Sequence, residues 1–140
     1  MATRWDDNVT VLQAETGMVN GEVAILAGYS SAGDGGGGQL YFTTPAPSAR
    51  LVTNATNATP IVVTTAAAHG MATGQRVMVA GVSGNTGANG TWVIGTTTST
   101  TLQLTGSAGT GAYTSGGALG DGGGTIPSAS TTQGVWTRIP

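Results

Sequence analysis

The amino-acid sequence predicts an all-β protein, in which a small glycine-rich β scaffold holds an inserted antiparallel β-barrel or sandwich. Three observations support this prediction. Glycine accounts for 25 of the 140 residues, well above its usual share of roughly 7%. Short β-branched runs recur at intervals of about 10–15 residues, the spacing of small all-β domains. An Asp-Gly-rich turn occurs twice, at Asp34 and at Asp121.

The central part of the chain predicts a series of short strands. Threonine alternates there with valine, isoleucine or leucine, and Gly, Asn or His-Gly separates one run from the next. No long helical pattern lies between the runs, as parallel βαβ units would require. The expected strands are residues 51–53, 60–65, 75–80, 90–95 and 100–105, with a short edge strand at 113–117.

The two ends of the chain predict the scaffold. The first end contains a compact apolar run and then an alternating run that leaves a turn, and the second end contains two short closing runs. The expected strands are residues 22–28, 39–43, 125–128 and 135–139.

The best candidate for a helix is residues 8–17. Asp7 or Asn8 would cap its start, and Gly17 would close its end. The segment is short and carries three β-branched residues, which lose side-chain freedom in a helix. An extended segment is therefore an equal alternative.

The repeated Asp-Gly turn suggests how the parts are joined. The two turns flank the central module, and insertions concentrate at exposed loop tips. We therefore expect an N-terminal arm with the first half of the scaffold at residues 1–49, an inserted module at 50–117, and the second half of the scaffold at 118–140.

The composition predicts a thin hydrophobic core. The chain has one Phe, three Tyr and three Trp, so it offers few large side chains to offset the conformational entropy of the backbone. One explanation is that parts of the chain are disordered. The β-branched runs favour a second explanation, in which neighbouring chains complete the core. We therefore expect a homo-oligomer.

Charge and targeting features narrow the classes of partner. The chain has no lysine, four scattered arginines and a net charge of −2, which indicates neither a nucleic-acid partner nor an anionic membrane surface. It has no cysteine and no apolar signal sequence at its start. We expect a soluble protein made in a cytoplasm.

The two turn aspartates are the sharpest candidates for a catalytic pair. A glycosidase needs two carboxylates lining one cleft, and Asp34 and Asp121 would have to meet there. However, Asp before Gly is a common turn residue, because its side chain binds local N–H groups. The turn interpretation is favoured, and neither catalytic, cofactor-binding nor metal-binding residues are expected. The expected structural turn residues are Asp34, Gly35, Gly36, Asp121, Gly122 and Gly123.

The sole histidine and the three tryptophans have structural interpretations. His69 precedes a glycine between two expected strands, and we expect it to hydrogen-bond the turn or pack on Trp92. Trp92 and Trp136 lie in strand patterns and would anchor either the core or a contact between chains. Trp5 lies in a polar N-terminal arm, where it would be either a subunit contact or part of a disordered terminus. Trp5, Trp92 and Trp136 are the candidate subunit contacts.

Two segments carry a resemblance to phage proteins. AILAGYSSAGDGGGGQLYF at 24–42 and GDGGGTIPSASTTQGVWTRI at 120–139 resemble the region that precedes the right-handed β-helix of pectate-lyase-like phage tailspikes. Residues 57–104, with PIVVTT, AHG, TGQRVMVAGV and NGTWVI, resemble a small β module of phage tail and fibre proteins. In tailspikes a β-helix with the active cleft follows, whereas this sequence stops at Pro140.

The resemblance implies a virion context without glycan cleavage. We expect a non-enzymatic structural protein on the outside of a bacteriophage particle, either a capsid decoration protein or a short fibre or tail attachment module. Its partners would be other virion proteins, and the trimeric state of tailspikes implies a homotrimer. The alternative is a glycan-binding or glycan-degrading module of a receptor-binding tailspike, with a host glycan as ligand.

Overall fold

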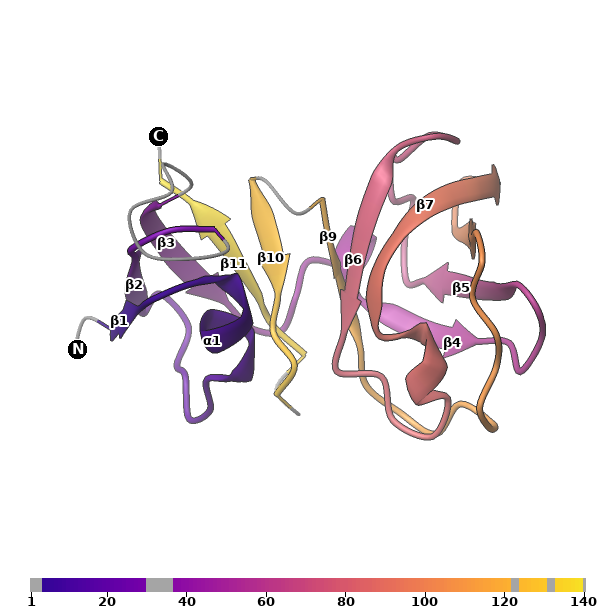
Figure 1. Ribbon diagram of the computed structural model, residues 1–140, viewed down its shortest axis with the longest axis horizontal. Helices are drawn as coiled ribbons and strands as arrows, with labels where there is room; N and C mark the ends of the chain where they lie inside the picture. The colour runs from indigo at the N-terminus through magenta and orange to yellow at the C-terminus, as the bar shows by residue number, and fades with distance from the viewer. Residues whose placement is uncertain (1–3, 30–36, 122–123, 131–132, 140) are drawn as a thin grey trace.

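The computed structural model describes residues 4–29, 37–121, 124–130 and 133–139. It contains two β-sheets that lie side by side (Figure 1). The five-stranded sheet is built from both ends of the chain, and the six-stranded sheet from its centre. The predicted all-β fold, a small scaffold with an inserted antiparallel barrel, is confirmed.

The scaffold sheet has the strand order β1-β2-β3-β11-β10. β1 runs parallel to β2, and the other neighbours are antiparallel. The sheet thus places the N-terminal strand at one edge and the strand that follows the second Asp-Gly turn at the other. The bounds are β1 Arg4–Asp6, β2 Val23–Leu26, β3 Gly38–Thr43, β10 Thr125–Pro127 and β11 Val135–Arg138.

The second sheet is a nearly closed antiparallel barrel with the order β4-β5-β8-β7-β6-β9. An isolated bridge between Leu51 and Ala118 and a 3.0 Å hydrogen bond from the Val52 N–H to the Gly117 carbonyl join its two ends. The bounds are β4 Val52–Ala55, β5 Ile61–Thr65, β6 Arg76–Ala80, β7 Gly90–Thr97, β8 Thr101–Leu104 and β9 Ala118–Gly120.

Some segments differ from the sequence expectations. β9 pairs with β6 in the barrel, whereas the position of the second Asp-Gly turn placed residues 118–120 in the scaffold. Residues 113–117 form an isolated bridge between Ser83 and Ser115 in place of the expected edge strand, although the Thr114 N–H also donates to the Ser83 carbonyl at 3.0 Å. β1 was not expected as a strand, since its sequence is polar.

The segment whose sequence fits either a helix or a strand contains helix α1, Val9–Ala14. It begins after Asn8, whose side-chain oxygen accepts a hydrogen bond from the Val11 N–H at 3.1 Å. Val9 and Leu12 are buried against the scaffold sheet, so tertiary packing decides the choice that propensity leaves open. Two short 3-10 helices complete the elements, η1 Ser48–Arg50 and η2 Thr86–Ala88. No helix in the described ranges is long and apolar enough to cross a membrane.

The described residues form two large hydrophobic clusters and a small third one of Ala46, Ala118 and Val135. The barrel cluster is filled by aliphatic residues of all its strands, including Ile61, Ile94 and Leu102, and the scaffold cluster centres on Phe42 and Trp136. Since aliphatic side chains supply most of both clusters, the shortage of aromatic residues does not leave the chain without a core. The composition alone therefore gives no reason to require neighbouring chains.

β6 connects the two clusters because both of its faces are buried. Val77 and Val79 point into the barrel cluster, whereas Met78 belongs to the scaffold cluster. A strand with only one buried face alternates between apolar and polar residues, and a strand buried on both faces is apolar throughout. The uninterrupted VMVA sequence of β6 therefore marks the place where the barrel packs on the scaffold.

Candidate functional site

The face of the scaffold sheet opposite the scaffold cluster carries an exposed apolar row. Trp5 pairs with Ile25, and Ile25 pairs with Gln39. Ile139 extends the row, since its N–H donates to the Gln39 carbonyl at 2.9 Å. Trp5 is 74% exposed and Ile139 is 39% exposed. Because side chains alternate along a strand, these residues share one face of the sheet.

A second row on the same face begins with Val23, which pairs with Tyr41. Tyr41 in turn pairs with Thr137 and is 40% exposed. We call the set of Trp5, Val23, Ile25, Tyr41 and Ile139 the outer face. Exposed apolar residues are ordinary one at a time, but a contiguous group on a rigid sheet is typical of a docking surface.

Ion pairs hold the edge strand β1 in place. The guanidinium of Arg4 donates through Nε to Glu22 Oε1 at 2.8 Å and through Nη1 to the carboxylate of Glu15. Its Nη2 donates to the Thr16 carbonyl at 3.1 Å. Arg4 therefore ties β1 to the segment that follows α1 and to the start of β2. Trp5 is thus displayed on an edge strand that pairs with β2 and that Arg4 ties to two other segments.

A buried carboxyl group lies next to this ion-pair cluster. Asp6 is 3% exposed, and burial together with the nearby negative charge of Glu15 raises the pKa of Asp6 to about 7. Neither Asp6 oxygen accepts a hydrogen bond from any donor in the described residues. Protonation of Asp6 therefore removes an unpaired buried charge next to Glu15.

The three tryptophans occupy different environments. Trp136 is fully buried, with its ring centroid 4.9 Å from that of Phe42. Trp92 packs against the barrel cluster and donates from Nε1 to the Ala88 carbonyl at 2.8 Å. Of the two roles left open, Trp136 takes the core role, whereas Trp92 is only partly buried at the barrel cluster. Trp5 is the exposed candidate for a subunit contact.

The first Asp-Gly turn, with Asp34, Gly35 and Gly36, lies outside the described residues, as do Gly122 and Gly123 of the second turn. Asp121 is described and lies between β9 and β10. Its Oδ1 accepts from the Thr125 N–H at 3.0 Å, and its own N–H donates to Thr125 Oγ1 at 3.0 Å. This reciprocal pair is the local turn contact that aspartate makes before glycine.

His69 is buried and takes part in the turn after β5. Its Nδ1 accepts from the Met71 N–H at 3.0 Å, and its Nε2 lies 2.9 Å from the Thr101 carbonyl. An accepting Nδ1 and a donating Nε2 correspond to one neutral tautomer. His69 therefore hydrogen-bonds the turn, one of the two contacts that the sequence suggested.

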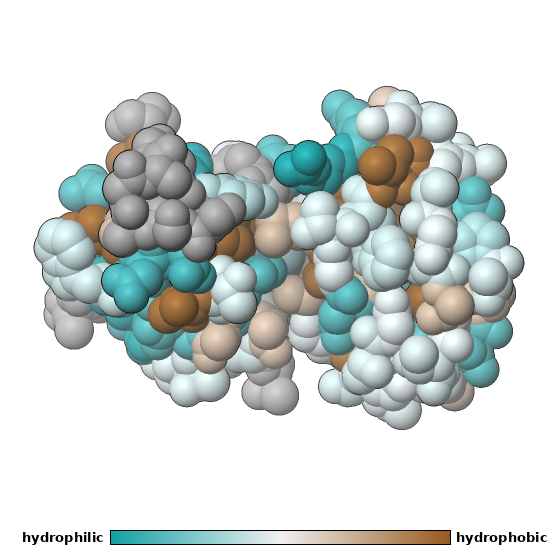
Figure 2. Space-filling view, viewed as in Figure 1, coloured by the Kyte–Doolittle hydropathy of each residue, from teal (hydrophilic) through white to brown (hydrophobic). Residues whose placement is uncertain are grey.

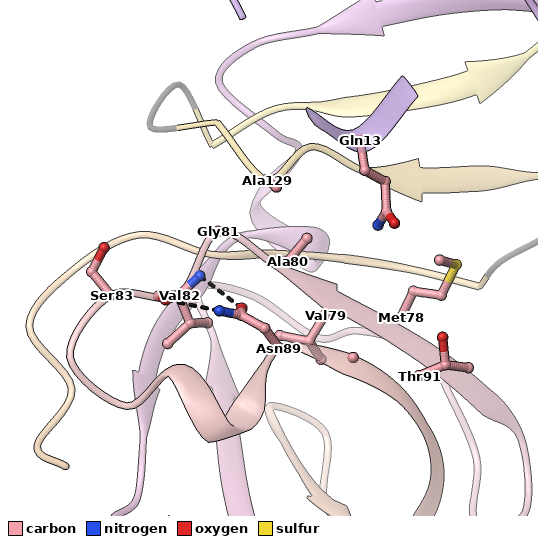
Figure 3. A pocket seen from close by; sticks show the side chains of 11 residues that line it. Gln13, Met78, Val79, Ala80, Gly81, Val82, Ser83, Asn89, Thr91 and Ala129 are labelled. Carbon is pink, nitrogen blue, oxygen red and sulfur yellow. Dashed lines mark hydrogen bonds between the residues drawn. The ribbon is translucent and has the colours of Figure 1, made fainter. Parts of the chain in front are cut away.

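A cavity of about 410 Å³ lies where the barrel meets the scaffold (Figure 3). Gln13 reaches over it from α1 toward Met78 and Thr91 of the barrel, and Ala129 lies at its rim. Gln13 Nε2 donates to the Pro127 carbonyl at 3.1 Å, and the Asn89 side chain pairs with both backbone groups of Val82 at 2.9 and 3.0 Å. The polar side chains here thus tie α1 to the strand beneath it and close a loop of the barrel.

Neither this cavity nor the outer face supplies paired acid–base groups. The residues that line the cavity are all uncharged, and no group of three or more His, Asp or Glu residues within the described ranges could hold a metal ion. Trp5 and Asp121 lie toward opposite edges of the scaffold sheet, since Trp5 is on β1 and Asp121 leads into β10. Exposed aromatic residues and Asp121 therefore do not form one cleft.

Comparison with known proteins identifies no relative of the chain. No protein-family model matches the chain, and no curated protein sequence is significantly similar to it. Its function is therefore inferred from its own residues, their geometry and the resemblance of its sequence motifs.

Proposed function

We propose that the chain is a non-enzymatic structural protein on the outside of a bacteriophage particle, which acts by docking through the outer face of its scaffold sheet. The observation that carries the proposal is the exposure of Trp5, at 74%, on a strand fixed by the ion pairs of Arg4. A large aromatic side chain on a fixed backbone can bury much apolar surface at the cost of ordering few side-chain torsions, which makes it a favourable anchor for a protein contact.

The neighbours of Trp5 support a docking role. Tyr41 and Ile139 are also exposed on the outer face, and Ile25 and Val23 fill the sheet surface between them. Burial of apolar surface contributes about 25 cal/mol of free energy per Å², so this group would provide the apolar centre of a contact. The polar Gln39 and Thr137 beside it would lie among these anchors.

The phage context and the threefold assembly are supported by the sequence motifs. The GDGGGG and GDGGGT segments resemble tailspike scaffolds, which are trimeric, and the barrel segment resembles modules of tail and fibre proteins. A decoration protein of the capsid and a short fibre or tail attachment module both fit this resemblance. The outer face would contact either a second copy or another virion protein.

The oligomer can be tested by sedimentation of the purified chain. We expect the wild type to sediment as a trimer and Trp5→Ala to shift toward monomer, because the variant removes the largest exposed anchor. Val93→Ala is the matched control, since Val93 is 52% exposed on barrel strand β7, and it should keep the wild-type state. A wild-type monomer at all concentrations would reject self-association as the docking mode.

A further inference from the structure

The barrel concentrates all of its charge at one place. Residues 50–117 contain no Asp, Glu or Lys, and their only charged side chains are Arg50 and Arg76. Both line the same cavity, of about 330 Å³. Much of the barrel surface seen in Figure 2 is near neutral in hydropathy. Of the charged residues that line this cavity, two are cationic and one, Asp121, is acidic, so the cavity carries a net positive charge.

The buried histidine helps to position one arginine. Arg50 Nη1 donates to the His69 carbonyl at 2.8 Å, and His69 itself is held by Met71 and Thr101. The remaining guanidinium N–H groups of Arg50 have no partner within the described residues, because its other contact, to the Ala49 carbonyl at 3.5 Å, also uses Nη1. Arg50 thus offers donors from a fixed position.

The other donors of the cavity lack partners. Arg76 makes no side-chain hydrogen bond or ion pair with any other described residue. The Gln75 side chain accepts from the Ala72 N–H through Oε1 at 2.8 Å, which leaves its Nε2 group without a partner among these residues. Three side chains therefore present N–H donors, and two of them are cationic. A carboxylate suits such donors, because a guanidinium binds it in a two-pronged geometry.

Two further lining residues restrict the kind of anion. Asp121 lies at the cavity, and its negative charge repels a doubly charged phosphate more strongly than a singly charged carboxylate. Its carboxylate oxygens can accept hydrogen bonds from hydroxyl groups. Met71 adds an apolar side chain, which suits the C–H face of a sugar ring. A volume of about 330 Å³ lies at the small end of the roughly 300–1,000 Å³ of ligand sites. One monosaccharide unit matches this size.

We propose that the cavity bounded by Arg50, Arg76 and Asp121 binds a carboxylate-bearing sugar. Arg50 and Arg76 hold the carboxylate, Gln75 and Asp121 hydrogen-bond ring hydroxyl groups, and Met71 packs against the ring. The site goes beyond the structural role of the outer face and does not depend on it, because the cavity belongs to the barrel and to the loop before β10.

The test is a titration of the full chain with sodium glucuronate, glucose and inorganic phosphate, followed by amide and Arg Nε chemical shifts. Glucuronate is expected to bind with a millimolar dissociation constant and to shift the signals of Gly70, Met71, Gln75 and Arg76. Glucose and phosphate are each expected to bind at least tenfold more weakly. Equal binding of glucose, or equal or tighter binding of phosphate, would overturn the assignment to an acidic sugar.

Variants separate recognition from folding. Arg76 is exposed at the start of β6, so Arg76→Gln and Arg76→Lys should retain the dispersed spectrum of the folded chain. Arg76→Gln is expected to weaken glucuronate binding at least tenfold. Arg76→Lys is expected to weaken it severalfold, because lysine keeps the positive charge but lacks the paired N–H donors of the guanidinium. Asp7→Asn, an exposed change far from the cavity residues in sequence, is the control and should bind as the wild type does. Unchanged binding by Arg76→Gln would refute the site.

Discussion

The hydroxyl group of Tyr29 in the scaffold donates a hydrogen bond to the sulfur of Met78 on barrel strand β6, at 3.8 Å. Met78 is nearly fully buried and belongs to the scaffold cluster, although its neighbours Val77 and Val79 belong to the barrel cluster. One side chain thus joins the two sheets. We conclude that the inserted barrel is packed on the scaffold and is not merely tethered to it.

The first prediction concerns this junction. Met78→Ala should lower the free energy of unfolding by about 2–4 kcal/mol, because it removes a buried side chain and leaves a cavity. Urea unfolding followed by tryptophan fluorescence measures this, since Trp136 reports on the scaffold and Trp92 on the barrel. Met78→Leu is the control and should cost less than about 1.5 kcal/mol. If Met78→Ala had the same free energy of unfolding as the wild type, the Met78 side chain at the junction would contribute nothing to stability.

The second prediction is a pH dependence caused by Asp6. Its pKa of about 7 in the folded chain lies above the ordinary value of 3.8, so the folded state holds a proton that the unfolded state releases. The stability from this proton is fully present below pH 3.8 and is lost as the pH rises through about 7. The shift corresponds to at most about 4 kcal/mol.

Asp6→Asn tests this pH dependence directly. The amide cannot ionise and can donate to Glu15, so the variant should be more stable than the wild type at pH 9 and should lose less stability between pH 5 and pH 9. Urea unfolding at pH 5 and at pH 9 gives the change in the free energy of unfolding for each protein. Asp7→Asn removes the neighbouring exposed carboxylate, whose charge makes the smallest contribution to the raised pKa of Asp6, and should keep most of the wild-type difference. If Asp6→Asn also showed the wild-type difference in stability between pH 5 and pH 9, protonation of Asp6 would not be the cause of that difference.

The third prediction concerns the close approach of Gly134 to Phe42. A methyl group on Gly134 would overlap the Phe42 ring, and that ring is fully buried against Trp136. Gly134→Ala should therefore destabilise the chain by about 2–3 kcal/mol through overpacking and alter the near-ultraviolet circular dichroism of Trp136.

Gly106→Ala separates this packing effect from backbone strain. Gly106 has a φ of +84°, and a methyl group added there would meet no atom within 4 Å, so its cost is a backbone term of about 1 kcal/mol. Thermal unfolding of Gly134→Ala and Gly106→Ala under the same conditions compares the destabilisation from overpacking with that from backbone strain. Equal losses would indicate that the Phe42 ring moves aside at no cost.

The sequence predicted the strands better than it predicted their partners. The runs at 60–65, 75–80 and 100–105 became β5, β6 and β8 with small shifts at their ends, because alternation and turn residues are local signals. The placement of β9 in the barrel depends on its pairing with β6, a contact between distant segments. β1 was missed because its pairing with β2 and the ion pairs of Arg4 outweigh its polar sequence.

The candidate sites were only partly visible in the sequence. Trp5 was identified as a possible contact because it is a lone aromatic residue in a polar arm, but its neighbours on the outer face follow from strand register. The raised pKa of Asp6 depends on burial and on Glu15, which only the folded chain brings together. The sequence shows that Arg50 and Arg76 are the only charged residues of 50–117, but only the fold brings the two together with Asp121 at one cavity.

The central proposal is tested most directly by a cryo-electron microscopy map of the intact phage particle whose genome encodes this chain. We predict density for the chain on the outside of the head or tail, with Trp5 and Tyr41 of the outer face covered by a neighbouring subunit. Absence of the chain from both head and tail, or a particle in which Trp5 faces solvent, would contradict the proposal.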